Sequence, residues 1–419
     1  MTTKPLISNG VSPTEVAGLP PIVCVGTPRW EGGDYLTSTV QLMSELARTE
    51  RVLYVDYPFT YKDIWAAKRG TAAGIPVEAL QGQEPALQVR ALAHGGQVQL
   101  LRLPPFLPAN FLQNPWLYDQ VLKFNTRRGL KAIKQALNSL GWATERPIVI
   151  NAFNPALGNA LAGKLNESVL LYYCYDEISA APWIARHGAR HEQQLLQSAD
   201  CTVVSSQGLV RTKKDLAQRL ALVKNGVDLS IFQTTNQGRP AELPAGPIIG
   251  YIGSVDDRLD VELLAAIAKA FPEVPLVFVG RIVAEHQAAI LRKFPNVYLL
   301  GAKPKERLGD YVHAFTVGLI PFVKNDLTAG IYPLKVNEYF ALGVPVVSTN
   351  FGDLTDFSEY IYVAEQTGDF IAGLEQVLAG NLPAEREACQ QFATQNTWEG
   401  RAQVLRQLLL DIHQQKQSA

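Results

Sequence analysis

The 419-residue sequence lacks several features that mark particular classes of protein. Its 38 Lys and Arg residues are balanced by 39 Asp and Glu residues, and the net charge of −1 argues against a dedicated nucleic-acid-binding protein. No run reaches the roughly 18 apolar residues of a membrane span, and residues 1–18 lack the apolar core of a signal peptide. The four cysteines are far apart, so we expect buried free thiols in a reducing compartment, the cytoplasm.

The sequence does contain short apolar runs that alternate with helix-like stretches. Hydrophobic residues make up 47% and charged residues 18% of a chain long enough for two or three domains. Runs at residues 22–26, 52–55, 169–175 and 201–205 indicate buried strands, which predicts a parallel sheet covered on both faces. Residues 61–97 are weakly patterned, and we expect irregular structure there.

The alternation restarts after residues 233–247, which are polar, rich in Gly and Pro and typical of a linker. The later apolar runs lie at residues 248–253, 276–280, 297–301, 317–322 and 345–349. They predict a second doubly wound α/β unit. A cleft between two such units is the default location for a ligand site.

Residues 320–349 combine a strand, a loop and a helix start. Pro333 stands where the first helical residue would be, with a φ angle already suited to a helix. Amides at a helix start carry partial positive charge and bind phosphate. Lys335 and Glu338 share a face of this helix, so Lys335 would offset diphosphate charge and Glu338 would accept hydrogen bonds from ribose hydroxyls. The alternative interpretation is a salt pair on a solvated helix.

A second loop, at residues 251–258, follows the first strand of the second unit. Gly253 would let the backbone approach a ligand, Ser254 lies beside it, and Arg258 would donate two hydrogen bonds to a phosphate. The loop does not contain Gly-x-Gly-x-x-Gly, which favours a single nucleotide diphosphate over a dinucleotide; an ordinary turn is the alternative. The remaining candidate contacts to the nucleotide sugar are Arg281, Thr328, Gly330 and Tyr332.

Three stretches of the second unit carry a resemblance to a known family: IIGYIGSVDDRLDVELL, FPNVYLLGAKPKERLGDYVHAFTVGLIPF and PLKVNEYFALGVPVVST. They resemble the donor-binding half of GT-B glycosyltransferases, in particular family 4-type enzymes of bacterial cell-surface polysaccharide assembly, such as teichuronic acid glycosyltransferases. The resemblance is clearest over residues 248–350, and the NGVD at residues 225–228 is also typical of the group.

The resemblance implies an α/β GT-B fold, with two Rossmann-like doubly wound domains that face each other across a cleft. Residues 1–230 would bind the acceptor and residues 231–397 the nucleotide-sugar donor, while a helix at residues 398–419 would cross back onto the first domain. The implied activity transfers a sugar, UDP-linked by resemblance, to a glycan or lipid-linked acceptor. Neither a cofactor nor an essential metal is implied.

One position departs from the family pattern. Retaining members commonly carry two glutamates at the spacing of positions 330 and 338, and the first helps to position the donor sugar. Glu338 matches the second, but Gly330 occupies the first position. The stereochemical course is therefore open, and an inverting enzyme with a carboxylate base becomes a credible alternative. The missing acid also leaves open a non-catalytic sugar-nucleotide-binding protein, and a UDP-sugar epimerase of the same architecture is a further alternative.

An inverting transfer needs a general base to take the proton of the acceptor hydroxyl. Asp176 directly follows the apolar run 169–175, where a parallel sheet presents residues to the cleft. By resemblance to the xanthan glucuronosyltransferase, Asp176 would match an aspartate with this role; capping of the next helix is its alternative. Glu177 and Asp34 are alternative bases, although Asp34 would also fit an ordinary turn.

Residues 116–140 predict a helix with a basic face, and aromatic residues precede it. The basic residues are Lys123, Arg127, Arg128, Lys131 and Lys134, and the apolar ones are Phe106, Leu107, Phe111, Leu112 and Trp116. This combination suggests that residues 106–134 dock on an anionic membrane, peripheral to the inner face of the plasma membrane. An ordinary amphipathic core helix is the alternative. His187 and His191 have zinc-ligand spacing, but we interpret them as incidental residues of a solvated helix.

Overall fold

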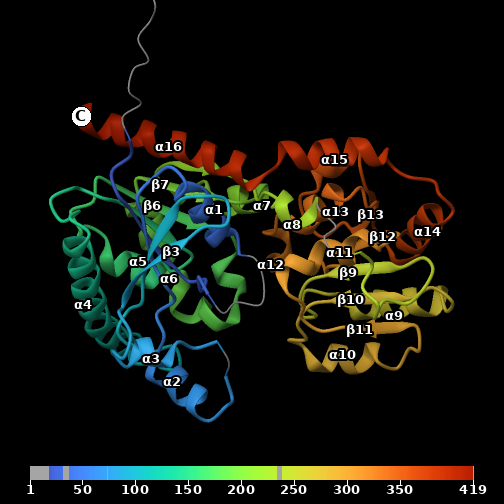
Figure 1. Cartoon of the computed structure of the whole chain (residues 1–419), viewed down its shortest axis with the longest axis horizontal. Helices are drawn as coiled ribbons and strands as arrows, with labels where there is room; N and C mark the ends of the chain where they lie inside the picture. The colour runs from blue at the N-terminus through green and yellow to red at the C-terminus, as the bar shows by residue number, and fades with distance from the viewer. Residues whose placement is uncertain (1–17, 32–36, 73, 234–237, 419) are drawn as a thin grey trace, which may run out of the picture.

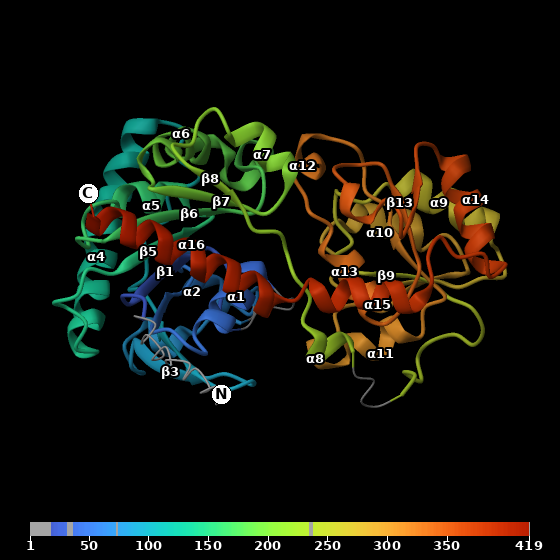
Figure 2. The same cartoon turned by 90° about the horizontal axis from the view of Figure 1, so that it is seen from above.

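The computed structural model describes residues 18–31, 37–72, 74–233 and 238–418. Figures 1 and 2 show two α/β lobes, each built around its own sheet. Asp34 lies outside the described residues. Within the described ranges, no helix is both long enough and apolar enough to cross a membrane.

The N-terminal sheet has eight strands in the order β3-β4-β2-β1-β5-β6-β7-β8. All neighbouring strands are parallel except β3 and β4, which are antiparallel. The strands are β1 (Ile22–Gly26), β2 (Val52–Val55), β3 (Leu87–Ala91), β4 (Gln97–Leu101), β5 (Ile148–Ala152), β6 (Val169–Cys174), β7 (Cys201–Val204) and β8 (Leu220–Leu222). The helices are α1 (Ser38–Leu46), α2 (Tyr61–Lys68), α3 (Val77–Leu80), α4 (Pro115–Ser139), α5 (Pro155–Leu161), the 3-10 turn η1 (Ile178–Ala180), α6 (Pro182–Ser198) and α7 (Gln207–Lys213).

The C-terminal sheet is parallel throughout, with six strands in the order β11-β10-β9-β12-β13-β14. The strands are β9 (Ile249–Ile252), β10 (Leu276–Val279), β11 (Val297–Leu299), β12 (Val317–Ile320), β13 (Val346–Thr349) and β14 (Tyr362–Ala364). The helical segments are α8 (Leu229–Phe232), α9 (Val261–Ala270), α10 (Glu285–Leu291), η2 (Lys305–Arg307), α11 (Leu308–His313), α12 (Asp326–Ala329), α13 (Leu334–Ala341), η3 (Thr355–Phe357), α14 (Thr367–Leu378), α15 (Arg386–Gln395) and α16 (Trp398–Ser418). The parallel sheets expected from the sequence are confirmed.

Residues 61–97 are more regular than we predicted. They form α2, α3 and the antiparallel edge strand β3. Thr60 starts α2 through a capping box, in which its side chain accepts from the Asp63 amide and Asp63 accepts from the Thr60 amide. The expectation of irregular structure was therefore wrong, because short capped elements carry little hydrophobic periodicity.

The last helix, α16, joins the two lobes. It leaves the C-terminal lobe after α15 and runs along the N-terminal lobe, as Figure 2 shows. Its buried side chains Trp398, Leu405, Leu409 and Ile412 belong to the same apolar cluster as residues of α1, β1 and β6. This burial of apolar surface holds the end of the chain on the N-terminal domain.

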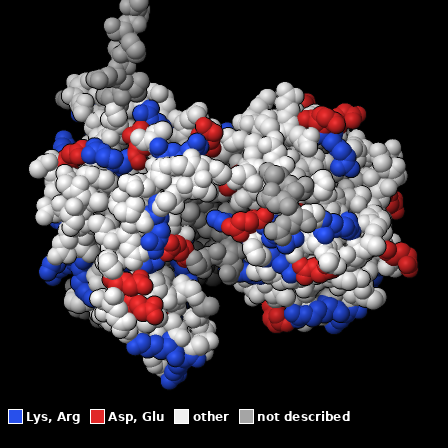
Figure 3. All heavy atoms as spheres, viewed as in Figure 1, with Lys and Arg blue, Asp and Glu red and all other residues white. Residues whose placement is uncertain are grey.

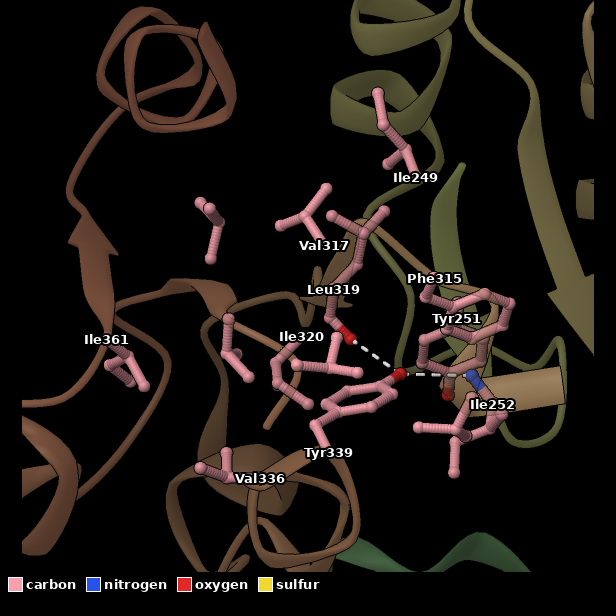
Figure 4. Close-up of a cluster of buried hydrophobic side chains, with 14 of the residues drawn as sticks. Ile249, Tyr251, Ile252, Phe315, Val317, Leu319, Ile320, Val336, Tyr339 and Ile361 are labelled. Carbon is pink, nitrogen blue, oxygen red and sulfur yellow. Dashed lines mark hydrogen bonds between the residues drawn. The ribbon is translucent and has the colours of Figure 1, made fainter. Parts of the chain in front are cut away.

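Tyr339 fixes α13 to the C-terminal sheet. Its hydroxyl accepts a hydrogen bond from the Ile252 amide at 3.0 Å and donates to the Leu319 carbonyl at 3.4 Å, as Figure 4 shows. The ring lies against Gly318, where an added Cβ would come within 2.7 Å of it. Each hydrogen bond contributes roughly 1 kcal/mol, and together with the packing they set the position of α13 relative to the end of β9.

Candidate functional site

The start of α13 lies at the seam between the two domains. Leu334 packs against the apolar cluster of the N-terminal domain, and the Ser206 hydroxyl donates to the Gly330 carbonyl at 2.6 Å. The Asn225 side chain contributes a weaker bond to the Tyr332 carbonyl, at 3.4 Å. Figure 3 shows a hollow between the lobes below this seam.

Pro333 is the N-cap of α13 and Leu334 its first helical residue, one position later than we predicted. Not every amide of this turn is available to a ligand. The Leu334 amide donates to the Tyr332 carbonyl at 2.8 Å, and the Val336 amide to the Pro333 carbonyl at 3.0 Å. Among the described residues, the Lys335 amide has no such acceptor. The anion-binding capacity of this turn therefore depends on the Lys335 amide and side chain more than on a row of amides.

The Lys335 side chain turns toward β9 rather than along its own helix. Its Nζ lies 5.6 Å from the ring centres of both Tyr251 and Phe322. Within the described ranges, no carboxylate lies within ion-pairing distance of it. Burial and the nearby charge of Arg258 lower the pKa of Lys335 to about 8. This half-buried ammonium is thus available to an anionic ligand.

Glu338 lies on the same helix and is also buried, with an exposed fraction of 8%. Burial raises its pKa to about 7; the Lys335 charge opposes that rise and the Asp228 carboxylate adds to it. Lys335 and Glu338 do not form an ion pair with each other, so a salt pair on a solvated helix is the wrong interpretation. A buried carboxylate without a strong donor can accept hydrogen bonds from ligand hydroxyls.

Gly253 makes room for Lys335. Its φ of 135° is unfavourable for other residues. An added Cβ would lie 2.4 Å from Lys335 Cε and 2.9 Å from the Tyr251 hydroxyl. The loop after β9 therefore needs glycine here for two independent reasons, conformation and close approach.

Arg258, from the same loop, is already engaged by a neighbour. Its Nε and Nη2 donate to the two carboxylate oxygens of Asp256, at 2.9 and 2.6 Å. We predicted that Arg258 would donate two hydrogen bonds to phosphate, whereas this structure directs that pair of donors to Asp256. The guanidinium still contributes positive charge to the seam, because it affects the pKa values of both Lys335 and Asp176.

Asp176 faces Arg258 from the opposite domain. It lies two residues after the end of β6, and none of the described residues donates a hydrogen bond to its carboxylate. Burial raises the pKa of Asp176 to about 6, and the Arg258 charge limits that rise. The turn after it is capped by Glu177, whose side chain accepts from the Ser179 amide. Helix capping by Asp176, our alternative interpretation, is therefore wrong.

Glu177, an alternative base, is fully engaged in structure. Its carboxylate accepts from Lys213 Nζ at 2.7 Å and from the Ser179 and Thr212 hydroxyls at 2.8 and 3.0 Å. Burial alone would raise the pKa of Glu177, but the Lys213 bond and charge outweigh it, and the net shift is downward. A carboxylate held ionised by a buried lysine is a poor proton acceptor.

The other predicted contacts are divided between the seam and the C-terminal core. The Thr328 hydroxyl is buried and donates to the Val323 carbonyl at 2.6 Å within the cap of α12. The Tyr332 ring packs against Phe357 in the core. Ser254 offers its carbonyl to the Tyr251 hydroxyl at 3.3 Å. Arg281 follows β10, where its carbonyl accepts from the Val255 amide at 2.8 Å.

Gly330 makes an interdomain contact. An added Cβ would lie 3.5 Å from Leu209 Cδ2 and 3.6 Å from Glu177 Cβ, both in the N-terminal domain. Sequence analysis missed its partner Ser206, which also caps α7 by accepting from the Leu209 amide at 3.1 Å. A Ser-Ser pair at the end of a strand signals a helix cap, but nothing in the sequence indicates a partner in the other domain.

The two histidines of α6 are buried. The ring of His187 stacks on Tyr118 at 3.8 Å and lies 2.8 Å from the Leu112 carbonyl oxygen. His191 lies 3.4 Å from an Asp119 oxygen. Our description of this helix as solvated is therefore wrong, because both rings pack between α6 and α4. Among the described residues, no group of three or more His, Cys, Asp or Glu side chains is arranged to hold a metal ion.

Comparison with known proteins identifies a family that part of the chain matches. Residues 246–380 match the family "Glycosyl transferases group 1". A curated relative, the putative teichuronic acid biosynthesis glycosyltransferase TuaH of Bacillus subtilis, is 28% identical over 203 residues, which is 45% of this chain and 51% of the relative. The chain thus matches only about half the length of that protein.

Solved structures confirm the GT-B fold. Sucrose-phosphate synthase from Thermosynechococcus elongatus aligns with a TM-score of 0.68 at 17% identity, covering 94% of this chain and 99% of that one. A UDP-forming trehalose-phosphate synthase from Burkholderia xenovorans, in complex with glucose-6-phosphate, gives 0.66 at 13% identity, covering 94% and 100%. The E. coli trehalose-6-phosphate structure bound with UDP-2-fluoro glucose gives 0.64 at 12% identity, covering 94% and 99%. The fold inferred from the sequence is therefore confirmed, and the family match of residues 246–380 confirms the resemblance over that part of the chain.

Proposed function

Because the chain carries a glycosyl transferases group 1 domain at residues 246–380 within a GT-B fold, we propose that it is a glycosyltransferase. It moves a sugar from a UDP-linked donor to a hydroxyl of a glycan or lipid-linked acceptor in polysaccharide assembly. The observation that carries this proposal is the pair Lys335 and Glu338 on α13, the helix that starts at the seam: Lys335 is half-buried, Glu338 is buried, and they form no ion pair with each other. One offers a cation to the diphosphate, and the other offers an acceptor to the ribose hydroxyls.

The choice of UDP rests on two supports. Two of the similar structures are named as UDP-forming or as bound with UDP-2-fluoro glucose. In addition, the family that residues 248–350 resemble implies a UDP-linked donor. The relative from B. subtilis supports teichuronic acid-like polysaccharide as the acceptor class.

The chemistry of the proposed reaction is stabilisation of a leaving diphosphate. As the bond from the sugar to the distal phosphate breaks, negative charge builds on the phosphate oxygens. Lys335 supplies the matching positive charge in a partly dehydrated place, with Arg258 nearby. Transfer through this lysine needs no metal ion, in keeping with the resemblance to metal-independent enzymes.

Asp176 is the proposed general base of an inverting transfer. It comes from the acceptor domain, its carboxylate is free of donors among the described residues, and its pKa of about 6 leaves it ionised at neutral pH. It would take the acceptor proton as the oxygen attacks the sugar carbon on the face opposite the diphosphate. Gly330 is consistent with this course, because it supplies no carboxylate next to the sugar.

If the acceptor is lipid-linked, the enzyme acts in the cytoplasm, peripheral to the inner face of the plasma membrane. A lipid-linked acceptor would present its sugar at the surface of the bilayer, and the basic α4 lies on the acceptor domain.

A thermal-shift panel of UDP, GDP, UDP-glucose, UDP-glucuronate and UDP-N-acetylglucosamine tests the donor class. A ligand at about 100 times its dissociation constant adds roughly 2.7 kcal/mol of stability. We expect stabilisation by UDP and by at least one UDP-sugar, and no shift in the variant Lys335→Met. Stabilisation by none of these ligands would refute the proposal, and conversion of the bound sugar to an isomer without transfer would favour an epimerase.

A further inference from the structure

One end of the N-terminal domain exposes large apolar side chains. They lie on α2, on the segment before α4, and on the first turns of α4. Their exposed fractions run from 39% to 70%, and the residues are Tyr61, Trp65, Leu107, Phe111, Trp116, Leu117 and Phe124. Single exposed apolar residues are ordinary, but a group of this size on neighbouring elements marks an interaction surface. We refer to these seven residues as the aromatic surface.

Contacts between the elements hold this surface together. The Arg128 guanidinium lies 5.9 Å from the Tyr61 ring centre and 5.7 Å from that of Phe124, so it bridges α2 and α4. The Tyr61 amide donates to the Phe106 carbonyl at 3.1 Å. The Leu107 amide donates to the buried Asn125 side chain at 2.9 Å. These contacts therefore hold α2, the segment before α4 and α4 together beneath the aromatic surface.

Cations surround the aromatic surface, whereas the local acids are engaged. The helix α2 with its C-cap, together with α4, carries Lys62, Lys68, Arg69, Lys123, Arg127, Arg128, Lys131 and Lys134. The acids of the same elements are Asp63 and Asp119. Asp63 caps α2, and Asp119 forms a bidentate pair with Arg190 of α6. Figure 3 shows Lys and Arg at the lower tip of this lobe, over α2 in the view of Figure 1.

The aromatic surface lies toward the same edge of the sheet as the proposed base. The segment leading into α2 follows β2, and the segment before α4 follows β4. Asp176 follows β6 of the same sheet, and β2, β4 and β6 run parallel. The carboxyl ends of parallel strands share one edge. A partner held on this surface is thus held on the acceptor side of the seam.

We propose that the aromatic surface docks on an anionic lipid bilayer. The membrane-binding region then consists of α2 together with residues 106–134. This inference rests on the proposed function only for the lipid-linked acceptor. Trp and Tyr rings sit well at the level of lipid headgroups, and Lys and Arg beside them attract anionic lipids. An acidic glycan would also be attracted by the eight cations, but the aliphatic Leu107 and Leu117 exposed among the rings favour the apolar interior of a bilayer.

Sedimentation with lipid vesicles tests the docking surface. The full chain is mixed with vesicles of phosphatidylcholine alone or with phosphatidylglycerol added, at low and high salt. We expect binding to the anionic vesicles only, and weaker binding at high salt. The triple variant Trp65→Ser/Phe111→Ser/Trp116→Ser should lose at least nine tenths of the bound fraction. Its control, Val283→Ser/Val404→Ser, removes apolar side chains that are equally exposed elsewhere and should bind like wild type.

Cation variants test the charge contribution separately. Replacing Lys123 and Arg127 by Gln should weaken vesicle binding about fivefold per charge, whereas replacing the exposed Lys269 and Lys293 of the other domain by Gln should not. Stabilisation by UDP is measured on every variant. Its loss would show that the proposed function or the fold is at fault, whereas its retention would show that only the docking surface has been changed. Wild-type protein that ignores anionic vesicles overturns the inference. So does vesicle binding that survives the triple variant, or a triple variant that alters only self-association or glycan binding.

Discussion

Replacing Lys335 by Met removes the charge that the proposed mechanism depends on while keeping a side chain of similar length. The structure predicts two opposite effects. The ammonium is half-buried beside Arg258 and its pKa is lowered to about 8, so the folded protein without ligand disfavours this charge. The same charge is expected to stabilise the leaving diphosphate. The variant should therefore be more stable than wild type and much less active.

The change in stability and the change in rate have separate physical causes. A fall in pKa from 10.5 to about 8 corresponds to about 3 kcal/mol of unfavourable surroundings for the ammonium. Removal of the charge should raise the free energy of unfolding by about 1–3 kcal/mol near neutral pH, since part of the gain offsets lost contacts. Loss of one donor to a developing oxyanion typically lowers the rate by about 100- to 1,000-fold.

The stabilisation gained by removing the Lys335 charge depends on pH. Below pH about 8 the lysine is protonated in the folded and unfolded states, and the folded protein carries the full cost. Between about pH 8 and 10.5 the folded protein has released the proton while the unfolded chain keeps it, so stability rises with pH. The difference in stability between Lys335→Met and wild type should shrink over this range.

Urea unfolding and a sugar-transfer assay that follows UDP release measure both effects. Lys269→Met, an exposed lysine change on α9, is the matched control and should alter neither. Turnover of Lys335→Met within a few-fold of wild type would refute the role of this residue. A variant that is both inactive and less stable would refute the argument that the ammonium is disfavoured in the folded protein.

Three further changes test the surroundings of Lys335. Gly253→Ala places a Cβ 2.4 Å from Lys335 Cε at a φ of 135°, so we expect a loss of about 1–3 kcal/mol in urea unfolding and weaker UDP binding; unchanged UDP affinity would contradict this geometry. Asp176→Asn should lower kcat by about 100- to 10,000-fold without changing UDP affinity; the wild-type rate should fall as pH drops below about 6, because the base is then protonated. Glu177→Gln weakens a bond to the buried Lys213 ammonium, so unfolding should show a loss of about 2 kcal/mol with UDP binding intact; catalytic loss without loss of stability would restore Glu177 as a candidate base.

The sequence was sufficient for the features set by local pattern. Alternating apolar runs predicted both parallel sheets, because strands buried on both faces consist of continuous apolar residues. The spacing of Pro333, Lys335 and Glu338 predicted one helix start, and the structure confirms that all three lie on α13 or at its N-cap.

Features that depend on contacts between distant segments could not be predicted. Asp176 and Glu177 both follow β6, but Glu177 accepts from Lys213 and Thr212 of α7 and from Ser179, whereas Asp176 has no such donor among the described residues. The sequence predicted Arg258 as a phosphate ligand, but its Nε and Nη2 donate to Asp256, two residues earlier in the same loop. The hydrogen bond between Ser206 and Gly330 joins the two domains, and a contact between residues so far apart in the sequence cannot be predicted from their spacing.

Calorimetric titration of UDP at pH 8, repeated in buffers of different ionisation enthalpy, tests the central claim most directly. Because the pKa of Lys335 is lowered to about 8, part of the ligand-free protein lacks this proton at that pH, and a diphosphate beside Lys335 would raise its pKa. Binding to wild type should therefore take up protons, and Lys335→Met should bind UDP weakly and take up fewer. Tight binding without proton uptake, or equal affinity for UDP in the variant, would show that the diphosphate lies elsewhere.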